Sequence, residues 1–295
     1  MNAPPRNVRD LLTRATGHLV EHGVPNARRN AEWMLCHTLG WSVLDLYVQS
    51  AERVGDDRAN AYWECVERRA QREPLQYILN STEFMSLPFD VHRGVFVPRP
   101  DTEVLVEHAE QRLRMFPLHC PLSVLDLCCG SGIIGVSLAH RIANLDVTSV
   151  DVSSAAARLT AHNARKNGVE ERLHVVPMDA FEFVEQSSKR FSAILCNPPY
   201  IETGELAGLP REVREHEPML ALDGGRDGLD FYRRIIPTMG ARLATGGFVM
   251  FEIGDTQGEA VSGLLRDSAF ARVEVVQDLS GRDRVVTGAR EWTNS

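Results

Sequence analysis

Apolar residues in the first part of the chain recur with the spacing of one face of a helix. Residues 8–21 and 27–39 each carry apolar side chains three and four positions apart, and Gly40 then favours the end of a helix. Residues 57–72 repeat this spacing within a strongly charged stretch. The pattern predicts a small helical bundle that forms an N-terminal domain over residues 1–73.

The pattern changes between residues 74 and 100, where short β-prone runs alternate with turn residues. These runs are residues 77–78, 83–85, 89–91 and 95–97. We interpret residues 74–100 as a hairpin-containing linker between two domains. Asp101 or Thr102 is then suited to cap a helix that runs to about Met115.

From residue 101 to residue 295 the chain alternates between strand-like and helix-like segments. Strands are expected at residues 124–127, 147–150, 173–176, 193–196, 247–253, 273–276 and 284–287. Helices are expected at residues 132–141, 155–167, 229–243 and 257–267. Such alternation predicts an α/β domain with a parallel sheet covered on both faces, and the last two strands indicate an antiparallel edge.

Composition and charge narrow the classes of function. The chain is 43% hydrophobic and 24% charged, which is typical of a globular protein. No apolar run approaches the roughly 20 residues that span a bilayer. The net charge of −8 argues against tight binding to a phosphate backbone, which needs a basic face. We expect a cytoplasmic protein with no membrane contact and no direct nucleic-acid partner.

A glycine-containing loop follows the first strand of the alternating part and opens a helix. The loop consists of Cys128, Cys129, Gly130, Ser131 and Gly132. In doubly wound sheets, ligands lie beyond the carboxyl ends of the strands at such a turn. Glycine lets the backbone approach a ligand closely, and the helix N-terminus favours a negative group. The loop is therefore a candidate cofactor site.

The glycines alone do not determine which ligand the loop binds. Gly130, Gly132 and Gly135 satisfy the G-x-G-x-x-G fingerprint of dinucleotide-binding folds, and Asp151 stands about 20 residues further on. A nicotinamide-dependent dehydrogenase is therefore one alternative, and a purely structural strand–helix turn is another.

Asp126, placed before the turn, favours S-adenosylmethionine as the cofactor. A carboxylate there would lie close to a pyrophosphate but suits the ammonium group of a methionine moiety. In this interpretation Asp151 holds the ribose hydroxyls, while Asp179 and Ala180, at the end of the third strand, border the adenine.

The chemistry is expected from Asn197, Pro198, Pro199 and Tyr200, which follow the fourth strand. Two successive prolines restrict the backbone, so that the segment can aim acceptors at a ligand. The Asn197 side-chain oxygen and the Pro198 carbonyl could accept both N–H groups of a planar amide or amine, and Tyr200 offers a flat face for stacking. Alone, the segment would suit a rigid turn. After a matching glycine loop it predicts methyl transfer to nitrogen, which a dehydrogenase would leave unexplained.

No metal site is expected. His18 to His22 match the H-x-x-E-H zinc pattern, but they lie on the flank of an ordinary amphipathic helix and no third ligand can be named.

Taken together, the motifs resemble the bacterial protein-(glutamine-N5) methyltransferases that modify peptide chain release factors. The resemblance runs almost from end to end. It is carried by Arg72–Ile78, by the P-R-P-x-T-E segment Pro98–Glu103, by Asn197–Tyr200, by the A-L-D-G-G segment Ala221–Gly225, and by Gly281–Val286. The chain departs from the family at Cys128 and Cys129, where a Gly-Thr pair is common.

The resemblance implies a seven-stranded, class I S-adenosylmethionine-dependent methyltransferase domain and an N-terminal helical domain that engages the release factor. The substrate would be the glutamine of a Gly-Gly-Gln motif. Residues 128–132 with Asp151 would bind the cofactor, and Asn197–Tyr200 would hold the glutamine amide. Asn197 is also expected to border the cofactor, and Phe96 to contact the substrate.

Three other functions stay open at this point. Enzymes that methylate a glutamine of a large-subunit ribosomal protein usually have serine in place of Pro100. Nucleic-acid adenine methyltransferases share the Asn-Pro-Pro-Tyr motif, but the acidic charge balance weighs against them. A cofactor-binding module without catalysis would not need Asn197.

Overall fold

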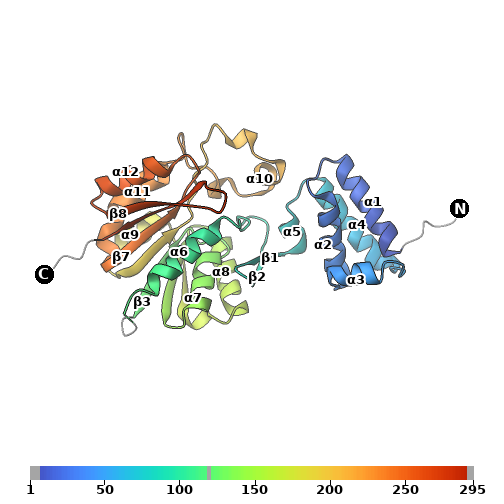
Figure 1. Ribbon diagram of the computed structural model, residues 1–295, viewed down its shortest axis with the longest axis horizontal. Coiled ribbons are helices and arrows are strands. Elements are labelled where there is room, and N and C mark those ends of the chain that lie inside the picture. The colour runs from blue at the N-terminus through green and yellow to red at the C-terminus, as the bar shows by residue number, and fades with distance from the viewer. Residues whose placement is uncertain (1–6, 118–120, 291–295) are drawn as a thin grey trace. The chain divides into compact units, whose positions relative to one another are not determined.

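A computed structural model describes residues 7–117 and 121–290 of the chain. The chain divides into two compact units. The helical unit contains the described residues up to Asn80 together with Pro210–His216, and the sheet unit contains Ser81–Leu209 and the described residues from Glu217 onward. Figure 1 shows the elements of both units.

The helical unit consists of short helices around an apolar core. Its helices are α1 (Val8–Glu21), α2 (Ala27–Leu39), α3 (Val43–Val48), α4 (Asp56–Ala70), α5 (Leu75–Leu79) and α10 (Arg211–His216). The expected helical bundle is therefore present. The Asn7 side chain caps α1 by accepting from the backbone N–H of Asp10 at 2.9 Å, and Gly40 ends α2 with a φ of +71°. Leu35 and Tyr62 are fully buried in the core.

The strand expected around residues 77–78 is wrong, because this segment forms α5. Pro74 stands at its N-cap, where the missing N–H of proline is tolerated. Leu75 and Ile78 then lie three positions apart and pack into the core of the helical unit. Burial of that apolar face prevailed over the β-preference of the side chains.

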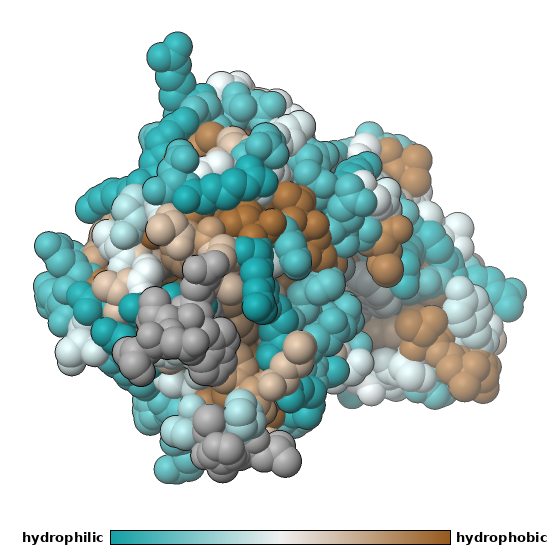
Figure 2. Space-filling view, turned by 60° about the vertical axis from the view of Figure 1, so that its left-hand side comes forward, coloured by the Kyte–Doolittle hydropathy of each residue, from teal (hydrophilic) through white to brown (hydrophobic). Residues whose placement is uncertain are grey.

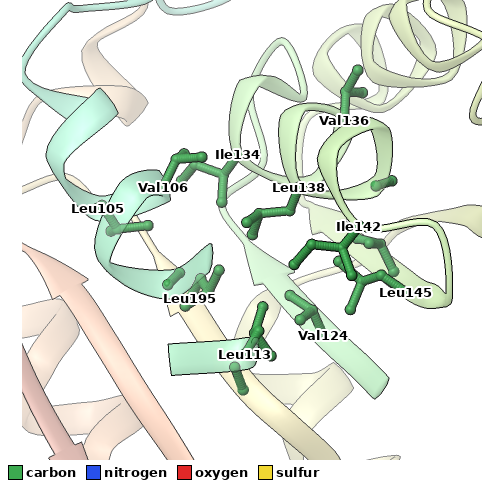
Figure 3. Close-up of a cluster of buried hydrophobic side chains, with 14 of the residues drawn as sticks. Leu105, Val106, Leu113, Val124, Ile134, Val136, Leu138, Ile142, Leu145 and Leu195 are labelled. Atoms are coloured by element: carbon green, nitrogen blue, oxygen red, sulfur yellow. The ribbon is translucent and has the colours of Figure 1, made fainter. Parts of the chain in front are cut away.

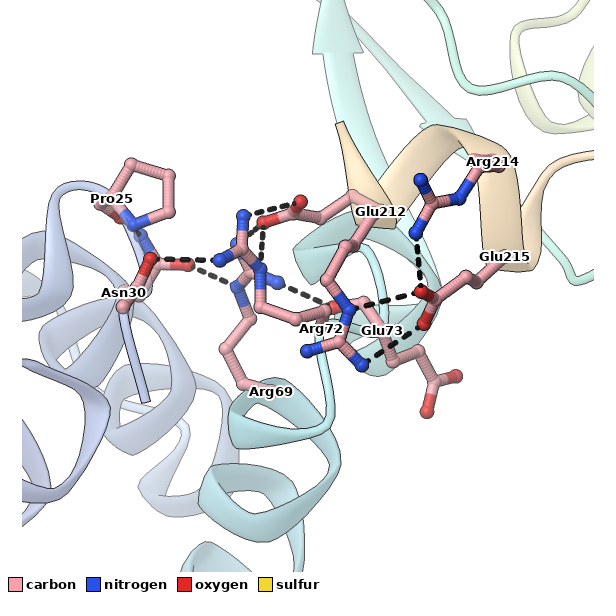
Figure 4. A network of polar contacts seen from close by, with 10 residues as sticks. Pro25, Asn30, Arg69, Arg72, Glu73, Glu212, Arg214 and Glu215 are labelled. Carbon is pink, nitrogen blue, oxygen red and sulfur yellow. Dashed lines mark hydrogen bonds and ion pairs between the residues drawn. The ribbon is translucent and has the colours of Figure 1, made fainter. Parts of the chain in front are cut away.

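Helix α10 joins the helical unit through Glu212, although it comes from a distant part of the sequence. Arg69 donates to Glu212 at 2.7 Å, and Arg72 donates to both carboxylate oxygens at 2.8 and 2.7 Å. Arg69 also donates to Asn30 at 2.8 Å, so the network in Figure 4 ties α10 to α2 and α4. Partial burial would raise the pKa of Glu212, but the hydrogen bonds from Arg72 and Arg69 hold it at about 2.

The sheet unit contains a seven-stranded sheet with the order β5-β4-β3-β6-β7-β9-β8. Its strands are β3 (Leu122–Leu127), β4 (Leu145–Asp151), β5 (Leu173–Pro177), β6 (Phe191–Cys196), β7 (Leu243–Glu252), β8 (Ala271–Gln277) and β9 (Asp283–Ala289). Strands β3 to β7 pair in parallel, whereas β9 runs antiparallel to β7 and β8. The predicted fold class, with its antiparallel edge, is confirmed.

Helices cover both faces of this sheet. They are α6 (Thr102–Leu113), α7 (Ile133–Arg141), α8 (Ser154–Lys166), α9 (Ala180–Gln186), α11 (Asp230–Met239) and α12 (Gly258–Asp267). Short 3-10 helices lie at Glu170–Arg172, Leu206–Gly208, Met219–Ala221 and Gly240–Arg242.

Successive residues of a strand face opposite layers, so Val124 and Leu125 of β3 enter different apolar cores. Figure 3 shows the first core, where α6 and α7 meet the sheet around Val124 and Leu138. The second core lies beneath α9, α11 and α12. These two cores hold the strand ends, and hence the loops beyond them, in fixed positions.

The expected hairpin is formed by β1 (Ser81–Phe84) and β2 (Leu87–Asp90), and it belongs to the sheet unit. Phe84 and Phe89 meet edge to face at 6.2 Å and are buried against the first core. The β-prone run at residues 95–97 is not a strand. Val95 instead packs beside Ala156 of α8, so the run is held by contacts with a helix.

On the face shown in Figure 2, hydrophilic surface predominates and hydrophobic residues form separate patches. Among residues 7–117 and 121–290, no helix is both long and apolar enough to cross a membrane.

Candidate active site

The predicted site residues stand at one edge of the sheet. Leu127, at the end of β3, lies opposite Val150 of β4 and Cys196 of β6, and Asp151 lies opposite Pro177 of β5. The carboxyl ends of these four parallel strands therefore meet at this edge. The structure brings together the glycine loop, Asp151, the segment around Asp179 and the segment from Asn197 to Tyr200.

The glycine loop takes backbone conformations that favour glycine. Gly130 and Gly132 have φ angles of +57° and +85°, and Cys128 has +57° although it carries a side chain. A Cβ on Gly132 would lie 2.8 Å from the Thr160 methyl carbon, so the loop packs tightly on α8. A Cβ on Gly130 would meet only Cys128 O at 4.0 Å, so the backbone there is open on that side.

Two buried side chains of α8 hold the glycine loop by donating hydrogen bonds to its carbonyl oxygens. Thr160 donates to Gly130 O at 3.0 Å, and Asn163 donates to Ser131 O at 2.8 Å. Asn163 also bonds the backbone of Asp90 in β2 through both its oxygen and its nitrogen. Neither side chain was among the residues predicted for the site. Their placement on the inner face of a helix that follows Asp151 was the available signal.

Asp151 connects the loop to the start of α8. Its carboxylate accepts from the backbone N–H of Gly130 and of Ser153, both at 2.9 Å. Burial raises the pKa of Asp151, and these two hydrogen bonds oppose that shift. A carboxylate oxygen has a second lone pair, so the two backbone bonds leave acceptor capacity for a ligand hydroxyl.

Asp126 lies fully buried beneath the loop. Its Oδ2 accepts from the backbone N–H of Gly135 at 3.1 Å and from the Ser149 hydroxyl at 3.3 Å. Its Oδ1 has no hydrogen-bond partner among the described residues. Burial raises the pKa of Asp126 to about 7. Its visible contacts hold the first turn of α7, and its role toward a methionine ammonium stays a prediction.

Asp179 and Ala180 open helix α9. The Asp179 carboxylate caps the helix by accepting from the N–H groups of Phe181 at 2.9 Å and Glu182 at 3.2 Å, and Ala180 is buried. The backbone N–H of Met178 bonds Asp151 O at 3.0 Å, which places this segment next to Asp151.

A chain of hydrogen bonds runs inward from Asn197. Its Nδ2 donates to Thr102 Oγ1 at 3.2 Å, and Thr102 donates to Glu252 Oε2 at 2.6 Å. Tyr200 donates to the other oxygen of Glu252 at 3.3 Å. Glu252 is 1% exposed, and this burial raises its pKa to about 7 against the opposing hydrogen bond from Thr102. Burial also raises the pKa of Tyr200, so its phenol stays neutral.

The backbone after Asn197 is braced by a second segment. Ile201 N–H bonds Leu222 O at 3.0 Å, and Ile201 O accepts from Gly224 N–H at 2.8 Å. A Cβ on Gly228 would lie 2.3 Å from Tyr200 O, and that oxygen accepts from the Gln257 amide at 2.9 Å. A Cβ on Gly224, in the A-L-D-G-G segment, would likewise lie 2.7 Å from Tyr200 Cα, so close approach to Tyr200 requires glycine at both positions.

Phe96 lies in a segment held by the buried Glu217. The Glu217 carboxylate accepts from the backbone N–H of Val97 at 3.2 Å and from the Arg99 guanidinium. Arg99 lies over the Phe96 ring at 4.8 Å. The pKa of Glu217 is raised by burial, while Arg99 opposes the shift. The Glu217 carboxylate, which comes from the loop after Tyr200, thus holds the segment from Phe96 to Arg99 in place.

Comparisons with known proteins identify the family. Residues 10–79 match the family described as the PrmC N-terminal domain, and residues 88–211 match the methyltransferase small domain. The chain is 43% identical over 281 residues to a release factor glutamine methyltransferase of Geobacter sulfurreducens, covering 95% of this chain and 96% of the relative. It is 38% identical to another from Cereibacter sphaeroides, covering 94% and 96%. The chain belongs to the release factor glutamine methyltransferase family.

Solved structures are also similar to this family member. A release factor-specific protein-(glutamine-N5) methyltransferase from Alicyclobacillus acidocaldarius is 35% identical, covers 66% of this chain and 94% of that chain, and gives a TM-score of 0.43. The T. thermophilus 16S rRNA N2 G1207 methyltransferase is 19% identical, covers 72% and 50%, and gives a TM-score of 0.50. The similarity to the T. thermophilus enzyme shows that the two proteins share a fold.

Two residues of this family member with central positions in the site were missed by sequence reasoning. Thr102 was treated as a helix cap, and Glu252 as the last part of a strand. The signal for Thr102 was its place in the P-R-P-x-T-E segment, and for Glu252 it was a lone acid after an apolar run. An acid at that position is expensive to bury without a function or a partner.

The residues present fit S-adenosylmethionine. The loop leaves its backbone open beside Gly130, which suits a ligand lying against it. Asp151 provides a carboxylate next to that opening, as a ribose diol requires.

Proposed function

We propose that this protein transfers a methyl group from S-adenosylmethionine to the side-chain amide nitrogen of a glutamine in a peptide chain release factor, within its Gly-Gly-Gln motif. The observation that carries the proposal is the Asn197 amide. It stands at the end of β6 beside the glycine loop, with its NH2 group committed to Thr102. Its oxygen is therefore the end available to a substrate N–H.

The glycine loop and Asp151 would hold the cofactor, with the segment of Asp179 and Ala180 beside its adenine. When bound, the cofactor supplies a sulfonium-activated methyl group. Thr160 and Asn163 keep the loop in position through their hydrogen bonds to its carbonyls.

The substrate amide is a weak nucleophile because its nitrogen lone pair is delocalised. Breaking that conjugation fully would cost on the order of 18–20 kcal/mol, as in peptide rotation. The Asn197 oxygen and the Pro198 carbonyl would accept the two amide N–H groups. They would orient the lone pair and stabilise the positive charge that develops on the nitrogen. Such charge-assisted bonds contribute about 1.5–3 kcal/mol each, so alignment must supply much of the remainder.

A strong base is not required. The nitrogen becomes acidic after it gains the methyl group, so its proton can pass to water. Glu252 is fully enclosed and bonded to Thr102 and Tyr200, which places it as a support for the site and not as a proton acceptor.

Release factors work in translation, so we propose a cytoplasmic location and a role for the helical unit in binding the protein substrate. The support is that residues 10–79 match the PrmC N-terminal domain and that the release factor glutamine methyltransferase of Geobacter sulfurreducens aligns with 95% of this chain. The net charge of −8 disfavours direct binding to nucleic acid.

The deciding experiment incubates the purified protein with methyl-labelled S-adenosylmethionine and, separately, a release factor, a ribosomal protein and RNA. We expect label on the release factor alone. A release factor with alanine in place of the Gly-Gly-Gln glutamine should stay unlabelled. Label on that variant would show that the target residue is wrong, and label on RNA would replace the proposed substrate class.

A further inference from the structure

Resting on the proposed function, we propose that Glu252 acts through Thr102 as a positioning residue that sets which end of the Asn197 amide faces the substrate. The three residues come from separate elements. Thr102 opens α6, Glu252 ends β7, and Asn197 follows β6, where Cys196 lies opposite Phe251.

The argument depends on the single proton of the Thr102 hydroxyl. A hydroxyl donates one hydrogen bond and accepts two, whereas a carboxylate only accepts. Above its raised pKa of about 7 Glu252 is ionised and only accepts, and with Thr102 Oγ1 2.6 Å from Glu252 Oε2 the hydroxyl proton points to the carboxylate. The oxygen is then an acceptor toward Asn197, and only the NH2 end of that amide can face it, at 3.2 Å.

The arrangement is enclosed, so water does not reassign these roles. Thr102 is 0% exposed and Glu252 is 1% exposed. Tyr200 donates to the second carboxylate oxygen at 3.3 Å, and Tyr232 donates to the Glu252 backbone oxygen at 2.7 Å. Both the carboxylate and the strand end that carries it are thereby held in place.

The consequence is a defined direction for the Asn197 oxygen. If the amide rotated by half a turn, its oxygen would face the lone pairs of Thr102, and its NH2 group would face the substrate N–H. Both contacts would then be unfavourable. The buried acid thus favours the one amide orientation that can accept from a glutamine side chain.

The test compares Thr102→Val, which keeps the shape but removes the hydroxyl, with Thr102→Ser, which restores it. Single-turnover methylation of a full-length release factor is measured at saturating S-adenosylmethionine and about pH 8.5, where Glu252 is ionised, and cofactor affinity is measured by calorimetry. We expect Thr102→Val to slow methylation by about 10²-fold, as for a misaligned reacting group. Thr102→Ser should keep most of the rate, and cofactor affinity should stay unchanged in both variants.

A double-mutant cycle separates positioning from general damage. Thr102→Val combined with Asn197→Ala should be no slower than Asn197→Ala alone, because the hydroxyl acts only through that amide. The inference would be overturned if the rate losses of the two single variants multiplied in the double variant. A wild-type rate for Thr102→Val would overturn it as well. If that variant does not fold, Glu252→Gln serves instead, since a neutral amide no longer dictates the direction of the Thr102 proton. Glu252→Gln alone should methylate more slowly than the wild type. Glu252→Gln combined with Asn197→Ala should be no slower than Asn197→Ala alone.

A readout without substrate separates this inference from the proposed function. The side-chain NH2 resonances of Asn197, assigned by their absence in Asn197→Ala, should exchange slowly with solvent in the wild type and faster in Thr102→Val. If the wild type methylates no glutamine but shows this difference, the proposed function fails and the positioning role stands. Equal exchange in both proteins would overturn the positioning role.

Discussion

At the scale of single residues, the site depends on side chains whose polar atoms are already committed. The NH2 group of Asn197 is bonded to Thr102, and both oxygens of Glu252 are bonded to hydroxyl groups. Such groups need no reorganisation when a substrate arrives, which is the condition for strong electrostatic stabilisation of a transition state.

The first prediction concerns Asn197 itself. Asn197→Ala removes the acceptor that strengthens as the nitrogen becomes positive, so turnover should fall by ~10²–10³ while cofactor affinity stays near the wild-type value. Asn197→Asp keeps an acceptor but loses the donor to Thr102, and we expect a milder loss. Single-turnover methylation at saturating cofactor measures both. A wild-type rate for Asn197→Ala would make the motif a structural turn.

The second prediction concerns pH and Asp126. Burial raises its folded pKa from 3.8 to about 7, so the folded state keeps a proton that the unfolded state has lost between these values. Its contribution to the free energy of unfolding should therefore fall as pH rises through this window, by on the order of 3–4 kcal/mol. Asp126→Asn should remove that part of the pH dependence.

Urea unfolding at about pH 5 and about pH 8, followed by circular dichroism, provides the measurement. Trp33, Trp41 and Trp63 lie in the helical unit and Trp292 lies outside the described residues, so fluorescence in a Trp292→Phe background identifies the transition of the helical unit separately. Glu259→Gln is the control, because its side chain is 88% exposed. An unchanged pH dependence in Asp126→Asn would show that Asp126 is ionised in the folded protein.

At the scale of elements, the geometry of the site comes from contacts between helices and loops. Helix α8 supports the glycine loop with Thr160 and Asn163, and α10 is anchored by two arginines of the helical unit. Each contact joins residues that are distant in the sequence.

The third prediction tests the packing of the glycine loop. Gly132→Ala would place a methyl group 2.8 Å from Thr160 at a φ of +85°, so the loop must move. Strain of about 1–3 kcal/mol should weaken cofactor binding by roughly 10–100-fold. Calorimetry measures the affinity. Gly263→Ala in α12, where nothing lies within 4 Å, should bind normally. If Gly132→Ala bound the cofactor as tightly as the wild type, the cofactor would lie away from this loop.

The fourth prediction tests the Glu212 contact. Glu212→Gln leaves Arg69, which is 5% exposed, without its charge partner, so the helical unit should lose about 3 kcal/mol of stability. The low pKa of Glu212 means that the wild type should lose the same contribution as pH falls from 4.5 toward 2. Tryptophan fluorescence in urea, in the Trp292→Phe background, follows this unit. Glu215→Gln on the same helix removes only the exposed ion pairs with Arg211 and Arg214 and should change little.

At the scale of the whole molecule, the chain passes between the two units three times. After Tyr200 it leaves the sheet unit at Leu209, contributes α10 to the helical unit, and returns at Glu217. The segment expected to hold the substrate amide is therefore close in sequence to the unit expected to bind the protein substrate.

The fifth prediction concerns the division of labour between the units. In hydrogen–deuterium exchange of the full chain, cofactor alone should protect only the sheet unit, around residues 128–132 and Asp151. Adding the release factor should also protect helices of the helical unit. Protection confined to the sheet unit in the ternary mixture would show that the helical unit does not contact the substrate.

Local periodicity predicted the long elements well. The ranges expected for α1 and α2 agree with the structure to the residue, and all seven strands of the sheet lie where apolar runs predicted them. The short helices α3, α5, α9 and α10 were missed or read as strand, because fewer than eight residues carry too little periodic signal. Family membership followed from motifs, since these are contiguous in the sequence.

The sequence by itself determined the strand–helix alternation, the glycine loop, Asp151 and the Asn-Pro-Pro-Tyr segment, because each is a property of neighbouring residues. Only the tertiary structure decided which distant side chains support them. Thr102 and Glu252 are separated by 150 positions and Arg72 and Glu212 by 140, and no local pattern encodes such pairs. They meet because the parallel strands end at one edge and the loop after Tyr200 folds back, and burial then requires each polar group to find a partner.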